Sequence, residues 1–247
     1  TMNIMLVNNN LTNDNFWVNY WKDFKPEKLG RIYFDELLND LDLKGDLLEV
    51  GGFPGRYAIY FNKIKKLRVT ILDKYIDIDI INKMERLNDL AEGTIKTCQG
   101  DFLTYNFEKT FDIVCSFGLI EHFDNTELAL KKHIALLKNN GTLLVNIPNF
   151  RGLNGLIQFY FDKRNFNAHN TRSMDLDLLK EICERNNLVQ IKVFYYGKPR
   201  LWLETDAKVK SGTRKIIELS SKIISRIPFS KNRFLAPYIF IIAKKYY

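Results

Sequence analysis

A cluster of glycines follows an acidic residue in "LLEVGGFPGRY", residues 47–57, just where a short apolar segment ends. Glu49 precedes Gly51 by two residues, Gly52 comes next, and Gly55 lies four residues after Gly51. Glycines after a buried strand let a ligand approach the backbone closely, because no Cβ stands in the way. In an open α/β sheet, ligands bind beyond the carboxyl ends of the strands, beside the first one. The stretch therefore predicts a small-molecule site, although a glycine pair after a strand is also compatible with a plain turn.

The spacing of these glycines excludes two kinds of phosphate-binding loop. A dinucleotide fingerprint that starts at Gly51 requires glycines where Phe53 and Arg56 stand, and no G-K-[ST] follows for a P-loop. The pattern that fits is E-x-G-x-x-x-G, followed by Asp73 at the end of the next apolar run. An acid at that place can accept hydrogen bonds from a ribose diol, and its alternative role is to cap the following helix.

Three more motifs follow in order, each at the end or start of an apolar run. They are "QGDF" (99–102), "FDIVCSFGLIEHF" (111–123) and "LKNNGTLLVNIPNF" (137–150). With the glycine stretch and Asp73, this ordered set resembles class I S-adenosylmethionine-dependent methyltransferases over residues 45–150. The resemblance implies S-adenosylmethionine as the cofactor and S-adenosylhomocysteine as its product.

The resemblance also implies a set of cofactor contacts. Gly51 and Gly55 would pass beneath the methionine part of the cofactor, and Glu49 would meet its ammonium group. Asp73 would accept from the ribose hydroxyls and Asp101 from the adenine amino group. The other positions implied around the cofactor are Gly52, Phe53, Lys74, Phe102, Ser116 and Phe117. Phe53 departs from the family, which usually has glycine there, so its ring either packs over the cofactor or narrows the pocket.

Methyl transfer to a hydroxyl benefits from a general base with a pKa near neutrality, which points to the three histidines. His122 follows the fourth apolar run and His169 lies in a loop that we place over the same edge of the sheet. We take these two as the catalytic candidates. The alternative for His122 is a role in structural support, and the alternative for His169 is a histidine in a surface loop. His133 lies inside a helical segment, where we expect it to pack or face solvent. We expect no metal site.

Absent motifs narrow the methyl acceptor. The fourth run ends in "CSFGL" and lacks the [DN]-P-P-[FYW] set of enzymes that methylate bases or glutamine, and no Lys/Asp/Lys/Glu tetrad for RNA ribose can be assembled. We therefore expect no nucleic-acid partner and favour O-methylation of a small molecule or glycan. The "NIPNF" and "APYIFIIAKK" segments resemble enzymes of bacterial surface-polysaccharide and secondary metabolism. N-methylation of a small amine and a non-catalytic cofactor-binding protein remain alternatives.

The elements that must position these residues alternate between strands and helices. Continuous apolar runs predict strands at 46–50, 67–73, 94–100, 111–117 and 141–147, with helices near 56–65, 77–91 and 125–138. A helix ending at 186–187 and strands in "VQIKVFYYG" and "APYIFIIAKK" complete the pattern, and two aromatic-rich helices, 12–24 and 27–41, precede it. This order predicts a doubly wound, seven-stranded, mostly parallel α/β sheet with an N-terminal helical lid and a helical insertion before the last strand.

Composition supports one domain over 1–247, divided into a helical cap (1–44), a cofactor-binding core (45–150) and substrate-side segments with the last two strands (151–247). Three widely spaced cysteines suggest neither a disulfide framework nor a zinc site. The N-terminal residues lack the pattern of a signal peptide, so we expect a cytoplasmic protein.

The chain's formal charge of +8 is concentrated in one segment. Residues 198–233 hold ten basic and three acidic residues, and "SGTRKIIELSSKIISRIPF" predicts an amphipathic basic helix over 213–227. Its apolar positions are Ile216, Ile217, Leu219, Ile223, Ile224 and Ile227. A lid, a homodimer contact and a peripheral contact with an anionic membrane are three alternatives for this helix.

Overall fold

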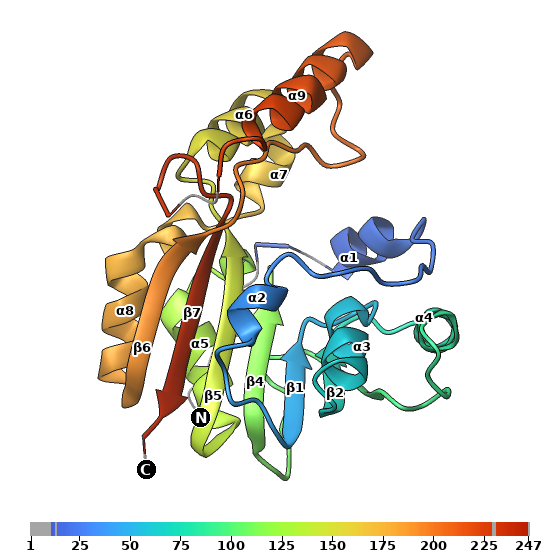
Figure 1. The fold of residues 1–247 in the computed structure, drawn as a ribbon, viewed down its shortest axis with the longest axis vertical. Helices are drawn as coiled ribbons and strands as arrows, with labels where there is room; N and C mark the ends of the chain where they lie inside the picture. Colours follow the sequence, from blue (N-terminus) through green and yellow to red (C-terminus); the bar gives the residue numbers. More distant parts are fainter. Residues whose placement is uncertain (1–10, 13, 229–230, 247) are drawn as a thin grey trace, which may run out of the picture.

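The computed structural model describes residues 11–12, 14–228 and 231–246, and its centre is one seven-stranded sheet (Figure 1). The strand order is β3-β2-β1-β4-β5-β7-β6, and β7 alone runs against its neighbours. The strands are β1 (Asp46–Val50), β2 (Arg68–Asp73), β3 (Lys96–Gln99), β4 (Phe111–Phe117), β5 (Leu137–Pro148), β6 (Leu188–Tyr196) and β7 (Tyr238–Lys245). The predicted doubly wound, mostly parallel sheet is confirmed.

Helices cover both faces of this sheet, and each face has its own apolar core. The helices that lie against it are α3 (Arg56–Lys63), α4 (Ile78–Leu87), α5 (Thr126–Ala135) and α8 (Leu176–Arg185). Leu47 and Ile113 belong to the core on the α3 and α4 side, whereas Leu48 and Val114 belong to the core on the α5 and α8 side. Successive residues of a strand point to opposite faces, which is why the buried strands are continuous apolar runs in the sequence.

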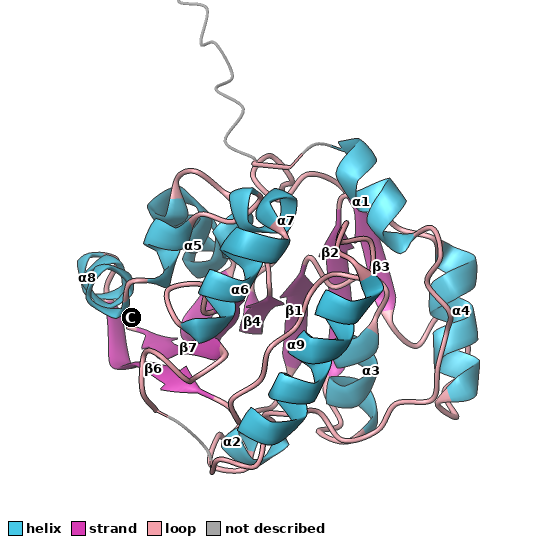
Figure 2. Ribbon diagram, turned by 90° about the horizontal axis from the view of Figure 1, so that it is seen from above, coloured by secondary structure: helices cyan, strands magenta, loops and turns pink. Residues whose placement is uncertain are grey.

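The remaining helices gather at the carboxyl edge of the sheet or beside it (Figures 1 and 2). They are α1 (Asp14–Trp21), α2 (Asp35–Leu38), α6 (Leu153–Phe161), α7 (Lys163–Asn167) and α9 (Ser211–Ile224), with short 3₁₀ turns at Ile120–His122 and Thr171–Met174. The predicted N-terminal helix and the helical insertion before the last strand are confirmed as α1 and α9. Figure 2 shows α6 and α9 side by side at the end of the molecule above the sheet.

The helix predicted over 27–41 is wrong except for α2, which has four residues. The preceding segment is held as an irregular strap against α4, where the Leu29 amide donates to Asn88 Oδ1 (2.8 Å) and the Asn88 side chain donates to the Glu27 carbonyl (3.1 Å). These contacts satisfy backbone groups that a helix would have satisfied internally. The apolar residues of the strap therefore reach the core without a helix.

Candidate active site

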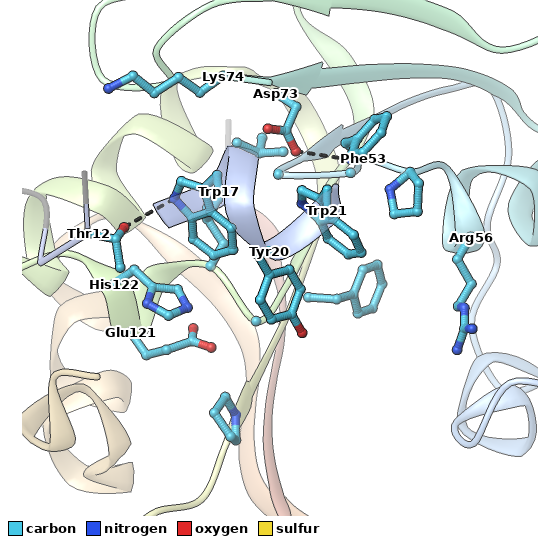
Figure 3. Close-up of a pocket in the computed structure, with 18 of the residues that line it drawn as sticks. Thr12, Trp17, Tyr20, Trp21, Phe53, Arg56, Asp73, Lys74, Glu121 and His122 are labelled. Atoms are coloured by element: carbon cyan, nitrogen blue, oxygen red, sulfur yellow. Dashed lines mark hydrogen bonds between the residues drawn. The ribbon is translucent and has the colours of Figure 1, made fainter. Parts of the chain in front are cut away.

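A cavity of about 720 Å³ opens at the carboxyl ends of β1, β2 and β4, beneath α1. Its size is in the roughly 300–1,000 Å³ range of small-molecule sites. Eleven of the thirteen residues predicted for the site line this cavity; they are Glu49, Gly51, Gly52, Phe53, Asp73, Lys74, Asp101, Phe102, Phe117, His122 and His169. Figure 3 shows the side chains of Asp73, Phe53, Trp17 and His122 arranged around it.

The glycine turn after β1 forms the floor of the cavity. Gly51 (φ +69°) and Gly55 (φ +95°) adopt a backbone conformation that favours glycine, and Gly55 precedes the first residue of α3. A Cβ on Gly52 would come within 2.9 Å of the carboxyl carbon of Glu49. A Cβ on Gly51 would lie 3.0 Å from Leu119 Cδ1. Gly51 and Gly52 line the cavity whereas Gly55 does not, and the predicted passage of the cofactor over Gly51 and Gly55 stays a prediction.

Glu49 is a buried carboxylate in the cavity wall, 2% exposed. Burial and the charge of Asp73 raise the pKa of the Glu49 carboxyl well above its usual range, against a backbone hydrogen bond from Ala58 that lowers it. Glu49 Oε2 has no hydrogen-bond partner among the described residues. A buried acceptor without a partner is costly, so this oxygen is suited to a cationic ligand group such as an ammonium.

Asp73 ends β2 with its carboxylate at the cavity, fixed by two backbone donors. Oδ2 accepts from the Phe53 amide and Oδ1 from the Tyr75 amide, both at 3.0 Å. Burial raises the pKa of this carboxyl to about 6 although three backbone hydrogen bonds act to lower it. These backbone hydrogen bonds leave a lone pair on each carboxylate oxygen, and the binding of a ribose diol requires such acceptors.

Asp101 and Lys74 lie together at the end of the cavity where the adenine is expected. Lys74 Nζ is 3.4 Å from Asp101 Oδ2, and Asp101 Oδ1 accepts from the Leu103 amide (2.9 Å). Phe102 is buried and packs edge-on against His133, with ring centroids 4.6 Å apart. His133 is fully buried, as one of its two predicted placements required.

Ser116 does not line the cavity. Its side chain is fully buried and its hydroxyl lies 3.0 Å from His133 Nε2. Side chains alternate along a strand, so Ser116 points into the core on the α5 side while its neighbour Phe117 reaches the cavity. The side chain of Ser116, which the resemblance placed around the cofactor, therefore points away from the cavity.

Phe53 packs toward the lid and does not fill the cavity. Its ring makes edge contacts with Trp21 of α1 (centroids 5.6 Å apart) and with Tyr75 (5.1 Å). Trp17, Tyr20 and Trp21 of α1 line the cavity from above, which agrees with the predicted N-terminal lid. The cavity stays open beside Phe53, so the main reason for expecting a closed, non-catalytic site is removed.

His122 and His169 meet in the cavity wall, with ring centroids 4.6 Å apart. Each ring is oriented by a backbone carbonyl: His122 Nδ1 lies 2.8 Å from the Ala168 oxygen and His169 Nδ1 lies 2.7 Å from the Asn165 oxygen. Burial lowers the pKa of His122 to about 3 and that of His169 to about 4. Both imidazoles are therefore neutral at pH 7.

Sequence reasoning missed two parts of this wall. Glu121, the residue before His122, is 1% exposed, and burial raises the pKa of its carboxyl to about 8. The segment after β6 supplies Arg200, Trp202 and Glu204. Glu121 could have been proposed from the sequence, because it directly precedes the candidate His122. Residues 200–204 could not, because only the fold brings them to a site built on β1.

Comparisons with known proteins place this geometry in a family. The family model described as "Methyltransferase domain" matches residues 20–193, well over half of the chain, so the chain belongs to that family. It is an S-adenosylmethionine-dependent methyltransferase, and S-adenosylmethionine is its cofactor. The partnerless Glu49 oxygen and the open lone pairs of Asp73 fit the ammonium and ribose of this cofactor.

A similar curated protein is (S)-coclaurine N-methyltransferase of Papaver somniferum, 32% identical over 101 residues, which are 40% of this chain and 28% of that enzyme. A methyltransferase structure from Archaeoglobus fulgidus is 20% identical, with a TM-score of 0.54, over 86% of this chain and 91% of the other. A phosphoethanolamine N-methyltransferase from Haemonchus contortus is 18% identical, with a TM-score of 0.56, over 94% of this chain and 53% of the other. Both solved structures share the fold of this chain.

Proposed function

We propose that the chain transfers the methyl group to a hydroxyl of a small molecule or saccharide, of the kind found in bacterial surface-polysaccharide or secondary metabolism. One observation carries the proposal: two neutral imidazoles face the cavity in the same tautomer. A carbonyl oxygen can only accept, so Nδ1 of His122 and of His169 carries the hydrogen and Nε2 keeps its lone pair. These lone pairs lie in the wall where an acceptor would bind.

In the proposed reaction, the acceptor oxygen attacks the methyl carbon as the bond from that carbon to sulfur breaks. The products are a methyl ether and S-adenosylhomocysteine, and the hydroxyl proton passes to the cluster formed by Glu121, His122 and His169. Alignment of oxygen, carbon and sulfur provides most of the rate enhancement, and the cluster adds proton transfer. Trp17, Tyr20 and Trp202 offer aromatic faces on which a sugar ring can stack.

N-methylation of a small amine is the second candidate, and Glu204 favours it. This carboxylate lines the cavity together with Tyr20 and Trp202, and it shares a side-chain hydrogen bond with Tyr20. Acids beside aromatic faces bind ammonium groups. The similarity to a curated N-methyltransferase agrees with this candidate. The two candidates differ in the atom that receives the methyl group.

A direct test uses S-adenosylmethionine labelled in its methyl group with a panel of saccharides, phenols and matched amines. The proposal predicts transfer to hydroxyl acceptors, with the product identified as a methyl ether by mass spectrometry and NMR. Transfer restricted to amine nitrogen would establish the second candidate. Binding of the cofactor without transfer to any acceptor would support the non-catalytic alternative.

We also propose that α9 contacts an anionic membrane surface. Four of the six apolar side chains of α9 and the turn that follows it are exposed in the described structure: Ile216 (67% exposed), Leu219 (61%), Ile223 (58%) and Ile227 (42%). The opposite side of α9 holds it to the domain, because Ile217 is buried and Ser221 Oγ accepts from the Leu201 amide (2.9 Å). The exposed four recur at helical spacing and so form one stripe.

Charge selects an anionic lipid surface over an apolar partner. Lys215, Lys222 and Arg226 are exposed beside the apolar stripe, and residues 198–233 carry ten of the chain's basic residues against three acidic ones. The helix α6 lies beside α9 (Figure 2), and it carries two exposed aromatic side chains, Phe159 and Tyr160. Apolar, aromatic and basic groups on one surface are the features of a helix that lies in a membrane interface. No helix in the part of the chain described by the structure could span a bilayer.

A further inference from the structure

Three potential metal ligands converge on the acceptor side of the cavity. One ligand atom each from Glu121, His122 and His169 lies within 4.8 Å of the other two. Glu121 and His122 come from the turn after β4, and His169 comes from the segment after α7, 47 positions further along the chain than His122. Figure 3 shows Glu121 and His122 next to one another at the cavity.

The two imidazoles are arranged as metal ligands usually are. A ligating histidine commonly donates its other ring N–H to a carbonyl or carboxylate, which fixes the tautomer and directs the free nitrogen at the metal. His122 and His169 both have Nδ1 within 2.8 Å of a backbone carbonyl oxygen. Both rings are therefore held so that a lone pair on Nε2 is available.

Glu121 supplies an independent observation. Its carboxylate is 1% exposed, and Oε2 has no hydrogen-bond partner among the described residues. Leaving a buried carboxylate oxygen unsatisfied is costly, and with Nδ1 of both histidines protonated, Nε2 of each carries a lone pair and no hydrogen to donate. A cation bound between the three groups would satisfy the carboxylate and both imidazoles together.

We propose that Glu121, His122 and His169 bind a divalent first-row transition ion such as Zn²⁺. Two imidazoles and one carboxylate are a ligand set for Zn²⁺ or Fe²⁺, whereas Mg²⁺ prefers oxygen ligands alone. With metal–ligand bonds of about 2.1 Å, ligand atoms lie about 3.0–3.4 Å apart. The present spacing of up to 4.8 Å is wider than that, so binding of the ion requires the three side chains to move closer together.

Three protein ligands would leave coordination positions open on the ion, and all three residues line the cavity. The role of the ion rests on the proposed function and changes its proton-transfer step, because imidazole lone pairs that bind the ion no longer accept a proton. An acceptor hydroxyl bound at an open position would lose its proton to water more easily and would be held in line with the methyl group. The oxygen then attacks the methyl carbon, the carbon–sulfur bond breaks, and a methyl ether and S-adenosylhomocysteine form.

The test titrates the full chain, stripped of metal by a chelator, with Co²⁺ and with Zn²⁺. Ligated Co²⁺ gives visible d–d bands that Zn²⁺ then abolishes by displacement. We expect one site per chain, and a loss of affinity of about 10²-fold or more in Glu121→Gln and in His169→Asn. Glu127→Gln is the matched control, because Glu127 is an acid on α5 whose carboxylate pairs with Lys131 and Arg185 and lies outside the cavity. It should bind as the wild type does.

Calorimetry with S-adenosylhomocysteine on the same samples reports whether each variant is folded. Absence of Co²⁺ and Zn²⁺ binding in a wild type that binds S-adenosylhomocysteine would overturn the metal site and leave the proposed function standing. Equal Co²⁺ affinity in Glu121→Gln and the wild type would also overturn it. Metal binding with no methyl transfer to any hydroxyl would instead reject the proposed function and keep the site.

Discussion

The Asp73 carboxylate accepts a hydrogen bond from the Phe53 amide, with 3.0 Å between Oδ2 and the nitrogen. This bond joins the end of β2 to the glycine turn after β1, and it sets the carboxylate at the edge of the cavity. Phe53 stands where the resemblance implied a glycine. The departure leaves this backbone donor in place, and the ring turns to Trp21 and Tyr75. A phenylalanine at position 53 is therefore compatible with the predicted role of Asp73.

Asp73 should make the stability of the cofactor-free protein depend on pH. Its pKa is raised from 3.8 to about 6 in the folded state, so between these values the folded protein holds a proton that the unfolded chain has lost. The contribution of this group is therefore most favourable below pH 4 and declines as the pH rises through 6, by at most about 3 kcal/mol. Denaturant unfolding from pH 4 to 8 should show the free energy of unfolding of the wild type falling relative to that of Asp73→Asn as the pH rises. A difference in unfolding free energy between the two proteins that stays constant with pH would contradict this prediction.

Cofactor affinity should change with pH in the opposite sense. The ribose hydroxyls donate to Asp73 as a carboxylate, so binding of S-adenosylhomocysteine should weaken as the pH falls below about 6. Calorimetry at pH 5 and pH 7.5 measures the change. Asp73→Asn should bind weakly at both, and a pH dependence in that variant equal to that of the wild type would assign the effect to another group.

Phe53→Ala should loosen the lid. The ring is 3% exposed and contacts Trp21, so its removal should lower the free energy of unfolding by about 3 kcal/mol. The backbone donor to Asp73 remains, so saturating S-adenosylhomocysteine should still stabilise the variant. A melting temperature unchanged from wild type would show that the ring contributes little to packing.

Replacement of either cavity histidine should affect turnover more than cofactor binding. His122→Asn and His169→Asn should lower turnover by about 10²- to 10⁴-fold with any hydroxyl acceptor of the wild type. Their affinity for S-adenosylhomocysteine should stay close to that of the wild type, because the predicted cofactor contacts lie on other residues. Unchanged turnover in both variants would mean that alignment alone carries the reaction.

The α9 surface predicts sedimentation with anionic vesicles. Wild type should sediment with vesicles containing phosphatidylserine more than with neutral ones, and Ile223→Asp/Ile227→Asp should remain in the supernatant. Ile64→Asp is the control, since Ile64 is also exposed (55%) but follows α3, away from α9 (Figure 1). Wild type that binds neither vesicle and forms a dimer disrupted by the double substitution would make this face a dimer contact.

The sequence predicted the features that depend on local pattern. The continuous apolar runs located the strands, and the acids at their ends marked the cofactor side of the cavity. The side chain of Ser116 points into the core and that of Phe117 into the cavity, because one position along β4 moves a side chain to the other face of the sheet. The motif alone did not indicate which of the two residues faces the cavity. The strap over 27–34 has an apolar pattern like that of a helix. It is not helical, and its backbone forms hydrogen bonds with the Asn88 side chain instead. Glu204 and the cluster of Glu121 with His169 required the fold itself, since distant segments form them.

The central claim is that the cavity holds S-adenosylmethionine with its ribose on Asp73, and calorimetry with S-adenosylhomocysteine tests it most directly. The account predicts micromolar binding at one site per chain in the wild type. In Asp73→Ala it predicts a loss of roughly 1.5–3 kcal/mol, or about 10- to 150-fold in affinity, while the fold is retained by circular dichroism. No binding by the wild type, or equal binding by Asp73→Ala, would contradict the account.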